Sequence, residues 1–62
     1  MKYTELHKII IANGWVLIPG RGKGGHRMYM KNGLVYPVPY HGSAEIQNYF
    51  AKKILKEMGI DK

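Results

Sequence analysis

Residues 26–39 decide the fold, and they run His-Arg-Met-Tyr-Met-Lys-Asn-Gly-Leu-Val-Tyr-Pro-Val-Pro. Asn32-Gly33 separates two six-residue stretches of alternating side chains. A two-residue type I′ turn needs positive φ at both central positions, and Asn-Gly is a favoured pair for it. The segment therefore predicts a β-hairpin with strands at 26–31 and 34–39. Its register pairs Lys31 with Leu34, Tyr29 with Tyr36 and Arg27 with Val38.

Strand alternation divides the side chains of this hairpin between two faces. We expect the first face to pack against helices, and it holds His26, Met28, Met30, Val35, Pro37 and Pro39. The second face is basic and aromatic, so we expect it to contact solvent or a partner; it holds Arg27, Tyr29, Lys31, Leu34, Tyr36 and Val38. Pro37 cannot donate to a ladder, which indicates an edge strand or a bulge.

On the N-terminal side of the hairpin, the pattern predicts a helix and then a strand. Leu6, Ile9 and Ile10 recur at helical spacing after Thr4, which can cap the helix, and Gly14 suits the position just past its end. Residues 15–18, Trp-Val-Leu-Ile, predict a short apolar strand that ends before a proline.

On the C-terminal side, a second helix is expected to begin after Ser43 or after Asn48 and to end at Gly59. Its apolar stripe comprises Phe50, Ala51, Ile54, Leu55 and Met58. The prediction is one α+β domain over residues 1–62, in the order α-β-β-β-α, with a three-stranded antiparallel sheet and two helices on one face. A domain of this size buries only about 60% of its unfolded surface, so we expect a shallow site that suits a polymer substrate.

The composition excludes several classes of protein. The chain contains no cysteine, which excludes disulfides, thiolate catalysis and cysteine-based zinc sites and fits a reducing cytoplasm. It has neither an 18-residue apolar run nor a signal-peptide pattern, so we expect a cytoplasmic protein without a membrane span.

Positive charge dominates the middle of the chain. The formal net charge is +6, and no acidic residue occurs from Leu6 through Ala44. Because lysine and arginine neutralise phosphates and release counterions, this balance favours a nucleic-acid partner. Residues 20–25, Gly-Arg-Gly-Lys-Gly-Gly, predict a basic loop whose bare backbone a polymer can approach closely. The predicted RNA-binding residues are Arg21, Lys23, Gly24, Gly25, Arg27 and Lys31.

The residue types leave histidine as the candidate for chemistry. The four carboxylates lie near the chain ends, which disfavours a metal-dependent nuclease, and the histidine spacing matches no zinc motif. RNA carries its own nucleophile, the 2′-hydroxyl, and a general base that removes its proton starts cleavage without a metal or cofactor. His26, between the glycine loop and a strand, is the candidate catalytic residue. The alternative is a purely structural role, as a strand histidine at the border of the core. His41 is a weaker candidate for a second proton carrier or a partner contact, and His7 is expected at the surface.

Four segments together resemble the HicA toxin family. They are Asn13-Gly14-Trp15, the stretch from Lys23 to Tyr29, Val38-Pro39-Tyr40-His41-Gly42, and the stretch from Ile54 to Ile60. The resemblance implies a fold like that of double-stranded-RNA-binding domains, metal-independent cleavage of messenger RNA with the family histidine at His26, and a HicB-type antitoxin that covers it. This chain has Gly25 where the family often has serine, and Arg27 where some members place a histidine.

Two other functions fit the same residues. A non-catalytic RNA-binding module would hold RNA through the basic loop and the Arg27, Tyr29 and Lys31 side chains. A pure protein-interaction domain would show no RNA affinity at low salt, where electrostatic binding is strongest.

Overall fold

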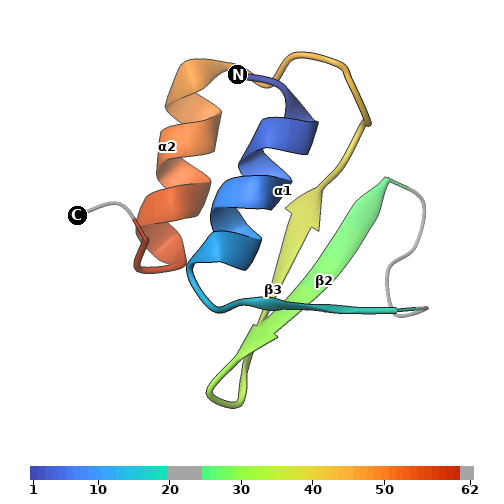
Figure 1. Cartoon of the computed structure of the whole chain (residues 1–62). Coiled ribbons are helices and arrows are strands. Elements are labelled where there is room, and N and C mark those ends of the chain that lie inside the picture. Colours follow the sequence, from blue (N-terminus) through green and yellow to red (C-terminus); the bar gives the residue numbers. More distant parts are fainter. Residues whose placement is uncertain (20–24, 61–62) are drawn as a thin grey trace.

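The computed structural model describes residues 1–19 and 25–60, and within them it confirms the α-β-β-β-α order. The elements are α1 (Tyr3–Ala12), β1 (Val16–Ile18), β2 (His26–Lys31), β3 (Leu34–Pro39) and α2 (Asn48–Glu57). The strands form one antiparallel sheet in the order β1-β2-β3, and both helices lie on the same side of it (Figure 1). The fold is therefore a two-layer α+β sandwich, and no helix or strand of the described residues covers the other sheet face.

The central hairpin has the predicted register. Lys31 pairs with Leu34, and the pairing continues without a bulge to His26 opposite Pro39. Asn32 and Gly33 have φ values of 51° and 80°, as a type I′ turn requires. β3 pairs with β2 alone, so Pro37 lies on an edge strand, where its missing N–H costs no ladder hydrogen bond.

The predicted orientation of the hairpin is wrong, because its two faces are exchanged. Tyr29 and Val38 are buried in the core at 1% and 2% exposure, whereas Met30 and Val35 are exposed. The face predicted to pack on the helices therefore looks outward. We call it the outer face, and the one that carries Tyr29 the inner face.

Polar partners explain why the basic and aromatic face is the buried one. The Tyr29 hydroxyl is hydrogen-bonded to His7 of α1, and the Tyr36 hydroxyl donates to the Glu57 carboxylate of α2. Burial and that carboxylate raise the pKa of Tyr36 to about 12. Arg27 and Lys31 lie near the two ends of β2, where long side chains keep their charged groups at the edge of the core.

Helix starts differ from the sequence expectation, whereas helix ends agree with it. α1 begins at Tyr3, not after Thr4, and its N-cap residue Lys2 gives no side-chain hydrogen bond. The Tyr3 N–H instead donates to the Ala44 carbonyl at 3.1 Å, so a distant segment satisfies the helix start. α2 begins at Asn48 itself, one residue before the later of the two proposed starts, and the start after Ser43 is wrong.

The ends of both helices follow the glycine rule. Gly14 and Gly59 have φ values of 92° and 75° directly after the two C-cap residues, as expected for a left-handed helix end.

The core lies between the helices and the inner face. Its buried members are Tyr3, Leu6, Ile10, Trp15, Tyr29, Val38, Ile46, Ala51, Ile54, Leu55 and Met58. Over the ranges 1–19 and 25–60, neither helix has the length and apolar character needed to cross a bilayer.

Candidate active site

His26 is the first residue of β2, and its side chain is exposed on the outer face. Its backbone pairs with Pro39 of β3, while β1 reaches only as far as Met28. Within residues 1–19 and 25–60, the strand end therefore has a paired neighbour on one side only. This position gives a substrate access to the imidazole while the ladder holds its backbone in place.

The residue before His26 is fixed by the segment that follows β3. The Tyr40 N–H donates to the Gly25 carbonyl, which extends the pairing by one step. A Cβ atom at Gly25 would lie 3.0 Å from Cε1 of His41 and 3.5 Å from the Tyr40 carbonyl oxygen. The His41 ring in turn meets the Tyr3 ring edge-on at 5.0 Å. His41 is thus packed between the start of α1 and the backbone next to His26.

Arg27 lies on the inner face, opposite its neighbour His26. Its guanidinium carbon stands 3.6 Å from the centre of the Tyr40 ring, which is cation–π geometry. In the part of the chain that the structure describes, no carboxylate forms a salt bridge with it. Arg27 is therefore a half-buried, oriented cation that retains its capacity to bind an anion.

His7 and Tyr29 complete a cluster next to Arg27. The Tyr29 hydroxyl lies 2.7 Å from Nδ1 of His7, and the His7 ring meets the Tyr40 ring edge-on at 6.3 Å. Desolvation by burial, and secondly the Arg27 charge, lower the pKa of His7. Burial raises the pKa of Tyr29, although Arg27 acts in the opposite direction. Both groups therefore favour their neutral forms near pH 7.

Lys31, another predicted RNA-binding residue, lies at the far end of β2. Five residues of strand separate it from His26, which corresponds to about 16 Å. Its ammonium donates to the Asn13 carbonyl at 2.7 Å, at the end of α1. Gly25, His26 and Arg27 are consecutive at the start of β2, but the side chains of His26 and Arg27 lie on opposite faces of the sheet, and Lys31 lies apart from all three. Arg21, Lys23 and Gly24 lie outside the described residues.

Sequence reasoning missed the cluster of His7, Tyr29 and Tyr40 around Arg27. His7 was expected at the surface and is half-buried instead. The sequence did contain a usable signal. His7 lies at helical spacing in the same stripe as three residues that are buried, namely Tyr3, Leu6 and Ile10. The sequence did not predict the orientation of the hairpin, and it is this orientation that makes Tyr29 face the stripe.

The described residues contain no group of three histidine or acidic side chains arranged to hold a metal ion. Comparison with protein families gave one clear result: residues 3–60 match the family model described as HicA toxin of bacterial toxin–antitoxin. No curated protein and no solved structure gave a significant match.

Proposed function

The chain belongs to the HicA toxin family, and from this premise we propose that it is an endoribonuclease that cleaves messenger RNA, with His26 as its general base. The single observation that carries the proposal is the exposed His26 ring at an open strand end. A general base must come within hydrogen-bond distance of the proton that it removes, and a buried imidazole would not meet this condition.

The proposed reaction uses only the RNA and protein side chains. Neutral His26 takes the proton of a ribose 2′-hydroxyl, and the 2′-oxygen attacks the adjacent phosphorus. The bond from phosphorus to the 5′-oxygen of the next nucleotide breaks, and that oxygen takes up a proton from the imidazolium. The products are a 2′,3′-cyclic phosphate and a 5′-hydroxyl. Histidine suits both proton transfers because its unperturbed pKa of about 6.5 is near the working pH.

Cations close to the histidine would bind the substrate and stabilise the charge that develops on the phosphoryl oxygens. We assign the stabilisation of this charge to Arg21 and Lys23, and we assign to Arg27, on the face opposite His26, a contact with the RNA backbone. We assign close approach of the RNA backbone to Gly24 and Gly25. The support for Arg27 is its guanidinium over the Tyr40 ring, which has no carboxylate partner among residues 1–19 and 25–60. Because Lys31 binds the end of α1, it would reach RNA only by giving up its hydrogen bond to Asn13.

The family also implies a protein that neutralises the toxin. We propose that a HicB-type antitoxin does so by covering His26. An exposed residue at a strand end can be blocked by a surface laid over it, without any change in the toxin's fold.

His26→Ala tests the catalytic role. We expect the purified variant to lose about a thousandfold or more in cleavage of messenger RNA, a loss that includes proton transfer and orientation effects. His7→Asn is the matched control because His7 contacts the inner-face residue Tyr29, and it should cleave at nearly the wild-type rate. Reactions contain EDTA, and fragments are analysed for 2′,3′-cyclic phosphate ends.

Circular dichroism establishes that both variants are folded. Cleavage by folded His26→Ala at the wild-type rate would overturn the assignment of His26. RNA that binds and stays intact with the wild-type protein would instead indicate a non-catalytic RNA-binding module.

A further inference from the structure

The guanidinium of Arg27 lies flat on the ring of Tyr40. Its central carbon is 3.6 Å from the ring centroid, which is the separation of two planar groups in van der Waals contact. An edge-on approach would place a nitrogen and its hydrogen between this carbon and the ring, and the distance would then be longer. One planar face of the guanidinium is therefore occupied by Tyr40, and the second planar face points away from the ring.

The hairpin register explains why these two side chains meet. Arg27 pairs with Val38 on the inner face, and Tyr40 follows two residues later, so Arg27 and Tyr40 are diagonal neighbours on adjacent strands. The Tyr40 N–H donates to the Gly25 carbonyl, which holds the Tyr40 backbone beside the start of β2. The His7 ring meets the Tyr40 ring edge-on at 6.3 Å. Tyr40 is thus a fixed support that orients Arg27 before any ligand binds.

In the described part of the chain, no second aromatic ring stacks on the guanidinium. Tyr40 is the one ring in cation–π contact with Arg27 among residues 1–19 and 25–60, and no carboxylate there forms a salt bridge with it. β1 pairs with β2 only as far as Met28, so no strand residue of β1 lies opposite Arg27. Because the side chain is only half-buried, a flat ligand can be added to the Tyr40–Arg27 pair as the third layer of a stack.

We propose that Arg27 and Tyr40 form a stacking site for an unpaired base of the RNA, beside the nucleotides whose phosphodiester is cleaved. The inference rests on the proposed function, which assigns the chain an RNA substrate, and it names the class of that substrate as single-stranded RNA. Unpaired bases stack on aromatic rings and on guanidinium planes, whereas a base inside a duplex is already stacked on its neighbours. The N–H groups at the edge of the guanidinium remain free to bind the backbone phosphate.

The opposite orientations of His26 and Arg27 also favour a single strand. Successive side chains leave a strand in opposite directions, so His26 is on the outer face and Arg27 on the inner one. An RNA that contacts both residues must turn around the start of β2, and a double helix resists bending over so short a length. Since the two side chains cannot hold the same nucleotide, the stacked base belongs to a nucleotide next to the cleaved bond.

A nucleotide uses more of this site than a protein carboxylate would. A carboxylate would accept hydrogen bonds at the edge of the guanidinium and leave its planar face without a partner. A nucleotide places its base on the face and its phosphate at the edge. The net charge of +6 favours the phosphate chain further.

Binding of short 2′-O-methyl oligonucleotides tests the stacking site. These probes lack the 2′-hydroxyl nucleophile, so their Kd does not depend on cleavage. One probe is a single-stranded oligoadenylate, and the other is a chain of the same length and charge without bases. Arg27→Lys keeps the charge and removes the planar face. It should weaken oligoadenylate binding by about fivefold and binding of the chain without bases by less than about twofold.

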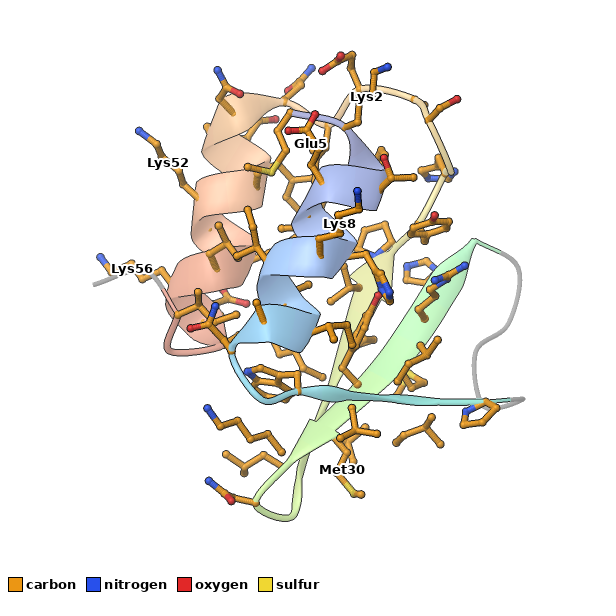
Figure 2. The ribbon with its side chains drawn as sticks, viewed as in Figure 1. Lys2, Glu5, Lys8, Met30, Lys52 and Lys56 are labelled. Carbon is orange, nitrogen blue, oxygen red and sulfur yellow. The ribbon has the colours of Figure 1, made fainter. Side chains whose placement is uncertain are left out.

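Lys52→Arg is the matched control, because it is the reverse exchange of the same two cations. Lys52 lies on α2 and points away from the sheet in Figure 2. This variant should bind both probes with the wild-type Kd. A loss of affinity in Arg27→Lys alone would therefore arise from the position of Arg27, not from the exchange of one cation for another.

Two substitutions test Tyr40 as a positioning residue. Tyr40→Phe keeps the ring and should retain the wild-type Kd for both probes. Tyr40→Leu removes the ring and should weaken oligoadenylate binding about as much as Arg27→Lys does. The double variant should lose little more, because both changes remove the same stack. Circular dichroism establishes that the variants are folded, and partial unfolding would weaken binding of both probes equally.

The outcomes separate this inference from the proposed function. Equal losses for the two probes in Arg27→Lys would overturn the stacking site and leave Arg27 a phosphate contact only. Annealing the oligoadenylate to its complement should abolish the difference between wild type and Arg27→Lys, and a difference that persists would overturn the assignment to single strands. Cleavage of messenger RNA without base-dependent binding would remove the stacking site alone. Base-dependent binding without cleavage would remove the nuclease assignment alone.

Discussion

The Tyr29 hydroxyl lies 2.7 Å from Nδ1 of His7, and this contact joins the central strand to the first helix at the border of the core. Tyr29→Phe removes the hydroxyl and keeps the ring, which is 1% exposed. We expect the free energy of unfolding to fall by about 1 kcal/mol, the net value of one such hydrogen bond. Tyr29→Ala also leaves a cavity and should cost about 3–5 kcal/mol. Urea unfolding measures both, and equal losses would show that the hydroxyl, not the ring, stabilises the fold.

His7 should make stability depend on pH. Because its pKa is lowered in the folded protein, the unfolded chain binds the proton more readily. Its contribution is complete above the unfolded pKa of about 6.5 and is lost as the pH falls through the lower, folded value. His7→Asn, which cannot take up this proton, should lose less stability between about pH 7 and pH 5. Urea unfolding at each pH measures this loss, and an equal loss of unfolding free energy in the two proteins across that range would contradict the prediction.

Arg27 should contribute to RNA affinity more than to stability. Arg27→Gln removes the cation that stands over Tyr40. We expect RNA binding to weaken by about tenfold and the salt dependence to lose about one phosphate contact. Lys52→Gln, on α2 and pointing away from the sheet in Figure 2, is the control with the same charge change and should have little effect. An equal loss in both variants would indicate that only net charge matters.

Gly25 has room for a small side chain but not for a branched one. Its φ is outside the left-handed region, so the nearest atom, Cε1 of His41 at 3.0 Å, sets the limit. Gly25→Ser should leave the unfolding free energy within about 1 kcal/mol of wild type, since the exposed His41 ring can shift by a few tenths of an ångström. Gly25→Val should displace His41 and lower both stability and cleavage. Thermal unfolding and cleavage rates distinguish the two, and a Gly25→Val protein that matches wild type would refute this packing.

The sequence predicted the order of elements and the hairpin register, because both depend on local chemistry. Asn32-Gly33 selects the turn, the turn fixes the pairing, and Gly14 and Gly59 mark the helix ends. The orientation of the hairpin depends on contacts between distant residues, and the prediction failed there. Tyr29 appeared to be a surface residue beside two cations, yet His7 satisfies its hydroxyl. The prediction of Thr4 as the cap failed for a similar reason, since the carbonyl of the distant residue Ala44 accepts the hydrogen bond from the Tyr3 N–H at the helix start.

For the candidate site, the role of His26 stays a prediction, and nothing in the sequence indicated its surroundings. His26 follows a glycine-rich stretch of sequence, which suggests access, and its exposure agrees with that. The packing of Arg27 on Tyr40 and of His41 against Gly25 brings residues 13 and 16 positions apart into contact. No short pattern encodes these contacts, because they depend on how the segment after β3 returns to the start of β2.

β2 is the middle strand of the sheet, so it pairs with both β1 and β3. It also contains His26 and the core residue Tyr29. Under the proposed function, substitutions in this six-residue stretch can abolish toxicity in two ways, by removing the imidazole or by unfolding the domain. Since Tyr29 is the buried residue of β2, survivors of toxin expression should carry substitutions of Tyr29 as well as of His26.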